Sequence, residues 1–258
     1  MPAFAEFAGD KQFATTLARG LELLRCFTTD DPVLGNKDLA GKTGLPKPTI
    51  SRFTYTLSQL GYLQVNRKLG KYQLGAAVLA LGYPLLATTA LRQIARPAMK
   101  QLAEYAQGSV SMAIRDRLNI VYIETSRSSS PFSRQLSDIG LSHPIPATAI
   151  GRAYLAACTA EDREALLNKI KVNSPELWDR HRQHMLESIG AFERRGFCVS
   201  HGDLRPGIHA VATPFRPLAN GEIVVFNCVL HAFLLKPGQL EKDIGPRLAA
   251  MVRSLESA

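Results

Sequence analysis

Three positions between Asn36 and Ile50 constrain the fold of this chain more than any other feature of its sequence. Counted from Asn36 as position one, position five is Ala40, position nine is Gly44 and position fifteen is Ile50. Position five needs a small side chain where two helices cross closely, and position nine needs a residue that tolerates positive φ in a tight turn. A β-branched residue at position fifteen fills the space between the helices. The spacing predicts a helix-turn-helix, in which Asn36 caps the first helix and the second begins near Pro46.

The segment after the second helix is typical of a β-hairpin with a charged tip. Residues 61–75, GYLQVNRKLGKYQLG, alternate in polarity on both sides of a basic stretch at 67–71. A hairpin in this place is the wing of a winged helix. We expect the second helix and the wing to contact a partner through Lys47, Pro48, Thr49, Ser51, Arg52, Tyr55, Arg67, Lys68 and Lys71.

The net charge indicates what kind of partner this is. The chain of 258 residues has 31 Lys and Arg against 22 Asp and Glu, a net charge of +9, and its pI is near 9.6. Residues 36–71 alone hold seven Lys and Arg against one acid, a net charge of +6. A basic surplus favours a polyanion, either nucleic acid or an anionic membrane. Its position on a helix-turn-helix favours double-stranded DNA, and the alternative is a structural helical hairpin with a solvated basic face.

Other protein classes are disfavoured by the sequence. The longest apolar stretch, residues 74–91, is interrupted by glycines and by Pro84, so it falls short of the ~18 residues of a membrane helix. The N-terminal residues carry acids and no apolar core, so we expect no signal peptide. The four cysteines form no CxxC pair, and nucleotide-binding motifs are absent. We therefore predict a cytoplasmic protein with reduced thiols, no metal, no cofactor and no membrane contact.

The rest of the chain predicts a second, α+β domain. Residues 76–107 are helical in pattern, with interruptions at Pro84 and Pro97, and from residue 109 the apolar period changes to that of strands. The predicted order of elements is α-β-β-β-α-α-β-β-β-α. We predict a DNA-binding domain at 1–75, a linker helix at 76–90 and a second domain at 91–258.

Several motifs, which follow one another in the same order as in a known protein family, indicate a resemblance to that family. The stretches are LARGLELLRCF, GLPKPTISRFTYTLSQLGYL, YQLGAAVLALG, LRQIARPAMKQLAEYAQGSVSMAIRD, ATAIGRAYLA and RRGFCVSHGDLRPGIHAVATPF. Over essentially its whole length the chain resembles the isocitrate lyase regulator (IclR) family of bacterial transcription factors. The resemblance implies a winged helix, a linker helix and, at 91–258, a GAF/PAS-like domain that binds an effector and oligomerises. It also implies dimers through the DNA-binding domain and often tetramers through the effector domain.

The resemblance further implies a pocket for a small organic acid, an aromatic compound or a quorum-related lactone. Carried over by position, the pocket residues are Thr148, Ala149, Ile150, Gly151, Ser200, Asp203, His209, Ala210, Asn227 and Val229. The chain departs from the family at Ala210, where many members have Cys, and its nearest acid to Ser200 is Asp203. The small residues at 149–151 would let backbone N–H groups reach a carboxylate.

Other candidate groups have simpler interpretations. His181 and His184 are spaced as a metal pair could be, but we expect an exposed polar face. Ser200, His201 and Asp203 are triad residue types without a nucleophile-elbow motif. Tyr122 and Phe132 are candidate pocket walls, and Met112 is expected to lie in the core.

Three functions remain open at this point. The first is a ligand-responsive transcriptional regulator, either repressor or activator, which is not an enzyme. The second is a small-molecule enzyme with an appended nucleic-acid-binding domain. The third is a constitutive DNA-binding scaffold with a degenerate effector domain.

Overall fold

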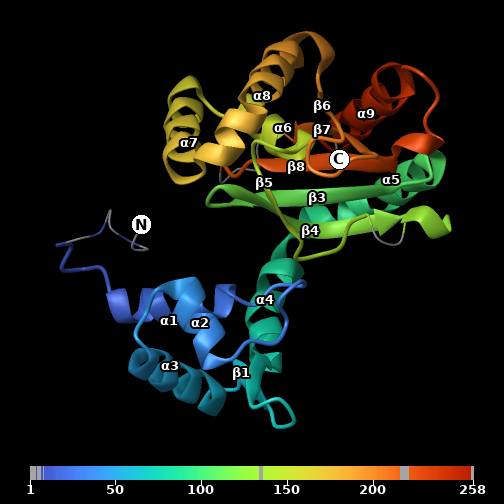
Figure 1. Ribbon diagram of the computed structural model, residues 1–258. Helices are drawn as coiled ribbons and strands as arrows, with labels where there is room; N and C mark the ends of the chain where they lie inside the picture. The colour runs from blue at the N-terminus through green and yellow to red at the C-terminus, as the bar shows by residue number, and fades with distance from the viewer. Residues whose placement is uncertain (1–3, 5–6, 8, 134–135, 216–220, 257–258) are drawn as a thin grey trace. The chain divides into compact units, whose positions relative to one another are not determined.

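The computed structural model describes residues 4, 7, 9–133, 136–215 and 221–256. It divides the chain into two compact units, residues 1–88 and 89–258, and each is described by itself (Figure 1).

The first unit is a winged helix. Its elements in chain order are α1 (Thr15–Arg25), α2 (Asn36–Thr43), α3 (Lys47–Gln59), β1 (Leu63–Asn66), β2 (Lys71–Leu74) and α4 (Ala76–Thr88). Leu23, Leu39 and Ile50 are fully buried where the first three helices meet. Gly44, between α2 and α3, has a φ of +69°, so the positive φ expected at position nine is present.

The start of α2 differs from the prediction. Gly35, rather than Asn36, stands at the N-cap position, and its N–H donates to Asp38 Oδ2 at 2.9 Å. The Asn36 side chain instead donates to Ser51 Oγ of α3 at 3.2 Å. Because the helix starts one residue earlier than expected, the Asn36 side chain links the two helices instead of capping one.

The helical stretch that follows is broken at a different place from the one predicted. Pro84 lies inside α4 and Pro97 lies inside α5 (Ala90–Ala106), so neither proline interrupts its helix. The break is at Thr89, whose φ of −82° and ψ of 89° are not helical. Residues of α5 on both sides of Pro97, among them Ala95 and Met99, are fully buried, and this packing holds the helix across the proline.

Among the described residues, no single helix combines the length and the apolar composition of a membrane span; α4 and α5 meet those criteria only when counted together across their break.

The second unit is built on an antiparallel sheet. Its strands are β3 (Ser109–Asp116), β4 (Asn119–Arg127), β5 (Ser142–Pro144), β6 (Cys198–His201), β7 (Ile208–Phe215) and β8 (Val224–His231). Within the described residues they pair in the order β5-β4-β3-β8-β7-β6. The helices that follow α5 are α6 (Ala149–Ala157), α7 (Ala160–Asn173), α8 (Pro175–Arg195) and α9 (Gly245–Leu255), the last preceded by a π-helical turn, Leu240–Ile244. Short 3₁₀ turns lie at Pro131–Ser133 and Ala232–Leu234.

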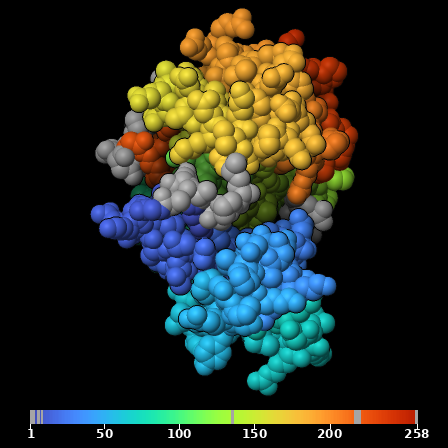
Figure 2. Space-filling view, turned by 60° about the vertical axis from the view of Figure 1, so that its left-hand side comes forward, coloured from blue at the N-terminus to red at the C-terminus, as the bar shows by residue number. Residues whose placement is uncertain are grey.

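Helices cover both faces of this sheet. α6 packs on β7 and β8, while α5 packs on β3 and β4 and α9 packs on β7. α7 and α8 lie outside α6, and the space-filling view shows them in yellow to orange as the outer surface of the unit (Figure 2). Three helices separate β5 from β6 in this fully described stretch, whereas the predicted order had two. The fold class, α+β with an N-terminal winged helix, is as predicted.

A β-bulge in β4 changes which side chains face which layer. Met112 of β3 pairs with Glu124 and Ala113 pairs with Tyr122, so Ile123 has no partner opposite it. Tyr122 packs with the core under α6, whereas Glu124 binds arginines of α5. Two residues that would share a face in a regular strand therefore serve opposite faces of the sheet.

Candidate functional site

The second helix of the helix-turn-helix presents a polar, basic face. Of the residues predicted there, Lys47, Pro48, Ser51, Arg52 and Tyr55 are exposed, Tyr55 by 67%, and Thr49 is half-buried. The side chain of Ser51 is engaged with Asn36. Within the described part of the chain, neither Lys47 nor Arg52 has an ion-pair partner, so both cations are available to an external anion.

The wing separates its three predicted cations into two kinds. Arg67 and Lys68 are exposed at the tip. Lys71 lies in β2, where its Nζ is 3.1 Å from Asp38 Oδ2. The backbone hydrogen bond from Gly35, and then the contact with Lys71, hold the pKa of Asp38 below its usual value. Lys71 is therefore tied to α2 by an ion pair that holds the wing against the helix-turn-helix.

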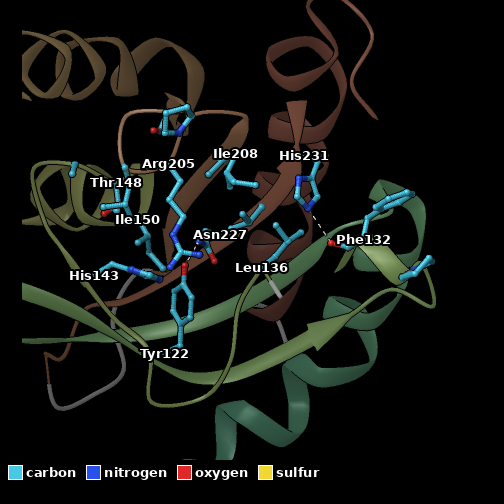
Figure 3. A pocket seen from close by; sticks show the side chains of 18 residues that line it. Tyr122, Phe132, Leu136, His143, Thr148, Ile150, Arg205, Ile208, Asn227 and His231 are labelled. Atoms are coloured by element: carbon cyan, nitrogen blue, oxygen red, sulfur yellow. Dashed lines mark hydrogen bonds between the residues drawn. The ribbon is translucent and has the colours of Figure 1, made fainter. Parts of the chain in front are cut away.

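The second unit contains a pocket of about 510 Å³ over β4, β7 and β8. Of the ten residues predicted by position, seven line it: Thr148, Ala149, Ile150, Ser200, Ala210, Asn227 and Val229 (Figure 3). Both predicted walls, Tyr122 and Phe132, also line it, and Met112 is fully buried in the core as expected. Gly151, Asp203 and His209 do not line it.

Gly151 supports the pocket from behind. Its Cα packs against the backbone of Ile145 so closely that a Cβ would clash with the carbonyl oxygen and Cα of that residue. Its N–H donates to Thr148 Oγ1, the N-cap side chain of α6, at 3.2 Å. This N–H is therefore used by the helix cap.

Asp203 faces away from the pocket and into a buried ion pair. Its Oδ2 lies 2.8 Å from Arg152 Nη2 and accepts from Ser200 Oγ at 2.9 Å, and its Oδ1 lies 2.9 Å from His184 Nδ1. Arg152 is 2% exposed and also donates to the carbonyls of Pro146 and Val199. Burial raises the pKa of the Asp203 carboxyl, but the Arg152 charge and the hydrogen bonds from His184 and Ser200 outweigh burial and hold it below the usual value.

His209 lies on the other side of β7 from the pocket. Ile208 and Ala210 line the pocket, and the side chain between them points the opposite way because strand residues alternate. His209 instead meets His201 edge-to-face at 5.0 Å, and His201 Nε2 is 2.9 Å from Glu241 Oε1. Burial and then His201 lower the pKa of His209.

His201 does not join Ser200 and Asp203, and the two histidines of α8 differ in exposure. His181 is buried at 5% exposure, contrary to the exposed face expected, while His184 is exposed. Ser200 and Asp203 do bond to each other, but His201 is bound to Glu241 instead. Among the described residues, no group of three or more His, Cys, Asp or Glu side chains could hold a metal ion.

Two polar side chains of the pocket, His143 and Arg205, were not predicted from the sequence. At one end lie His143, Arg205 and the pair of Tyr122 and Asn227, whose Nδ2 donates to the tyrosine hydroxyl at 2.8 Å (Figure 3). At the other end His231 Nε2 is 3.1 Å from the carbonyl oxygen of Phe132, and the two rings meet edge-to-face. Tyr122, Phe132 and Asn227 were predicted to lie here, whereas no sequence pattern indicated His143 or Arg205.

Burial keeps two of these side chains neutral. Burial raises the pKa of Tyr122 to about 12, so the phenol stays protonated. Burial, and then the nearby Arg205 charge, lower the pKa of His143, so its imidazole is neutral near pH 7. The polar end of the pocket therefore combines neutral hydrogen-bonding groups with one guanidinium.

Comparisons with known proteins agree with both units. The IclR helix-turn-helix domain model matches residues 16–67, and the model of the bacterial transcriptional regulator IclR C-terminal matches residues 84–233. The HTH-type transcriptional regulator TsaQ1/TsaQ2 of Comamonas testosteroni is 34% identical over 243 residues, which cover 94% of this chain and 87% of that protein.

Solved structures give the same result. An IclR family transcriptional regulator from Brucella abortus is 42% identical, with a TM-score of 0.87, over 96% of this chain and 93% of its own. An IclR homologue from Microbacterium hydrocarbonoxydans, crystallised in complex with 4-hydroxybenzoate, is 20% identical and shares the fold, with a TM-score of 0.66, over 93% of this chain and 99% of its own. Because sequence and fold agree over nearly the whole length, this chain belongs to the IclR family of bacterial transcriptional regulators, which join a helix-turn-helix DNA-binding domain to a C-terminal ligand-binding domain.

Proposed function

We propose that this regulator binds a pseudo-palindromic operator through its winged helix and changes its DNA binding when a small organic effector, acidic or aromatic, occupies its pocket. The observation that carries the proposal is the presence, in one chain, of two features: exposed cations on α3 with no ion-pair partner among the described residues, and a pocket of about 510 Å³ with a polar and an apolar end. The functional division is then 1–75 for DNA binding, 76–90 for the linker and 91–258 for effector binding and assembly. The site of action is the bacterial cytoplasm, where operator DNA and metabolites meet.

Operator reading is assigned to the exposed face of α3. A recognition helix places its first turns in the major groove, where side chains reach base edges. Arg52 is the candidate for a bidentate contact to guanine, with Lys47, Pro48, Thr49, Ser51 and Tyr55 around it. Arg67 and Lys68 at the wing tip are assigned to phosphates, and Lys71 supports the wing through Asp38.

A gel-shift comparison tests this assignment on an operator selected from random duplexes by the full-length protein. We expect Arg52→Ala to weaken operator binding by ~1–3 kcal/mol and to relax selectivity at one base pair, because a lost bidentate contact costs about that much. Arg67→Ala should instead weaken all sequences alike and reduce the salt dependence by about one charge, as for a phosphate contact. Unchanged affinity and selectivity in the Arg52 variant would remove it from the recognition surface.

The partner that completes the DNA-binding form is proposed to be a second copy of this chain. Residues 75–89 carry no charged side chain, and Leu79, Leu81, Tyr83 and Leu85 of α4 are all exposed. Leu81 also lines a largely apolar groove, together with leucines of α1 and with Arg52, Phe53 and Leu57 of α3. An uncharged, exposed surface of this kind favours association, and a two-fold dimer would present two α3 helices to two half-sites. The assembly is then a homodimer, or a homotetramer if the effector domains also pair.

The effector signal is proposed to leave the pocket through β4. Tyr122 lines the pocket, and on the far side of the bulge Glu124, 5% exposed, binds Arg96 Nη2 at 2.7 Å and Arg92 Nη2 at 3.0 Å. Both arginines lie in the first two turns of α5, directly after the boundary with the first unit. An effector with different affinity for two positions of Tyr122 would thereby shift α5 and the linker before it.

Ligand turnover separates the regulator from the enzyme alternative. A library of metabolites is screened by thermal shift, and each stabilising compound is incubated with the protein and analysed by mass spectrometry. A regulator returns the ligand unchanged and alters the gel shift, whereas turnover would favour the enzyme. The absence of any stabilising compound would favour the constitutive scaffold.

A further inference from the structure

The side chains that line the pocket carry one fixed charge. Of the eighteen lining residues, all within the described chain, Arg205 is the only one that is permanently ionised, and none is Asp or Glu. The structure gives the Arg205 side chain no hydrogen bond or ion pair with any described residue. His143, near it, is neutral near pH 7 because burial and the Arg205 charge both disfavour its protonated form. The pocket therefore presents a single uncompensated positive charge.

This charge is held at the pocket by the loop between β6 and β7, residues 202–207. Leu204, Arg205 and Pro206 line the pocket, while Asp203 is bound to Arg152, His184 and Ser200 below the loop. Asp203 has 11% of its side chain exposed, and Arg152 has 2%. Since buried Arg152 already neutralises Asp203, the acid in the loop does not compensate Arg205.

The rest of the pocket is mostly apolar. Its lining includes Pro131, Phe132, Leu136, Ile208 and Val229. Phe132 lies at the opposite end of the pocket from His143 (Figure 3). Phe132 also meets the rings of His231 and Phe233 edge-to-face, at 6.3 and 5.2 Å. Apolar and aromatic walls favour a ligand body of the same character.

We propose that the effector is an amphipathic monoanion whose oxyanion group pairs with Arg205 and whose apolar or aromatic body lies against Phe132, and that Asp203 is a positioning residue for Arg205. The inference rests on the proposed function, since it names the ligand class of the same pocket. A guanidinium pairs with a carboxylate or sulfonate through two parallel hydrogen bonds, which makes such contacts strong and specific. A second anionic group would be desolvated without a partner in this pocket, and that is unfavourable.

Matched probes test whether the pocket prefers a monoanion over neutral and dianionic ligands of the same shape. Benzoate, benzenesulfonate, benzamide and isophthalate share one ring and differ in charge, and phenylacetate, phenylacetamide and homophthalate repeat the comparison with a longer body. Binding of each to the full-length protein is measured at pH 7.5 by calorimetry and by thermal shift. We expect each monoanion to bind at least tenfold more tightly than its neutral amide and its dianion. The two benzene acids show whether carboxylate or sulfonate is preferred.

Two arginine variants separate the pocket charge from the general surface charge. Arg205→Gln should abolish the preference for the monoanion over the amide, whereas Arg253→Gln, an exposed arginine of α9, should leave it unchanged. Asp203→Asn should weaken monoanion binding while retaining the preference over the amide, because Arg205 is displaced and not removed.

Three outcomes would overturn the proposal: no monoanion binds better than its amide, a dianion binds better than its monoanion, or Arg205→Gln keeps the preference. The gel shift keeps this test separate from that of the proposed function. A neutral ligand that changes operator binding would sink the monoanion rule and leave the regulator intact. Monoanions that bind more tightly than their amides and dianions but never change operator binding would support the ligand class and contradict the proposed regulator function.

Discussion

Asp203 and Arg205 lie two residues apart in one loop, and their charges face different surroundings. Asp203 is bound to buried Arg152, and its pKa is held below the usual value in spite of burial. Breaking a buried ion pair by removing one charge is costly because the other charge stays buried without compensation. The stability of this unit should therefore depend on the ionisation of Asp203.

Asp203→Asn should lower the free energy of unfolding by about 3 kcal/mol at pH 7, because Arg152 loses its counter-charge. A carboxyl with a lowered pKa stabilises the fold above its unfolded value and loses that contribution as the pH falls through the folded value. The difference between wild type and variant should therefore be full at neutral pH and shrink below pH ~3.9. Urea denaturation at several pH values measures it.

Asp138→Asn is the matched control for this variant. Asp138 is 68% exposed and pairs with Arg127 at 2.8 Å, and exposed pairs contribute little. We expect a loss below about 1 kcal/mol. Equal stability of Asp203→Asn and wild type at pH 7 would contradict the role given to the ion pair.

At the scale of elements, α6 is packed tightly against its neighbours in the second unit. It packs on β7 and β8, contributes Ala149 and Ile150 to the pocket, and approaches the backbone of Ile145 through Gly151. Backbone atoms cannot move aside as a flexible side chain can. A single added methyl group at this crossing should therefore displace the helix and the pocket wall together.

Gly151→Ala is expected to destabilise the protein by ~3 kcal/mol, at the upper end of the cost of overpacking. Gly190→Ala is its control, because Gly190 lies inside α8 and an added Cβ there meets nothing within 4 Å. Since Ala favours a helix interior over Gly, the control should be stabilised by up to about 1 kcal/mol. Chemical denaturation of both variants compares them, and a Gly151→Ala variant as stable as wild type would show that the crossing is not tight.

Features that depend on residues close together in the sequence could be predicted from it, whereas contacts between distant segments could not. The helix-turn-helix depends on residues at most fourteen positions apart, so the spacing of Ala40, Gly44 and Ile50 was sufficient. Positions carried over from the family reached seven pocket residues. His209 was misplaced because it was taken together with Ala210, although adjacent strand residues face opposite sides.

The remaining errors concern contacts between distant segments. Asp203 was expected in the pocket for its closeness in sequence to Ser200, but its direction depends on Arg152, fifty-one positions earlier. Arg205 was missed because a cation in a Gly- and Pro-containing loop usually faces solvent. The helix break was placed at Pro84 and Pro97, but both prolines lie inside their helices, Pro97 among buried residues of α5, and the actual break is at Thr89.

At the scale of the whole molecule, the proposed assembly of subunits would depend on apolar surfaces that are exposed in the single chain. Leu79, Leu81 and Tyr83 of α4 are between 64% and 76% exposed, so these large apolar side chains are not covered within the chain. Apolar patches of this kind mark interaction surfaces. If a second copy covers them, mass and DNA affinity should change together.

Leu81→Glu should shift the protein towards monomer in sedimentation experiments and lower the affinity for a two-half-site operator at least tenfold, because a charge would be buried at the interface. Leu69→Glu, at the exposed wing tip, is the control for the sedimentation measurement and should leave the oligomeric state unchanged. A Leu81→Glu protein with wild-type mass would place the subunit contact elsewhere.

The bulge at Ile123 has a consequence for how the protein can evolve by substitution. In a regular strand, even-numbered positions share one face, and a substitution there affects a single layer. Ile123 resets this parity, so Tyr122 belongs to the ligand layer and Glu124 to the helix layer, although they are near neighbours in one strand. Under the proposed function, ligand preference and the strength of the response would therefore be altered by separate point substitutions in β4, which would give evolution, or a designer of sensors, two controls within three residues.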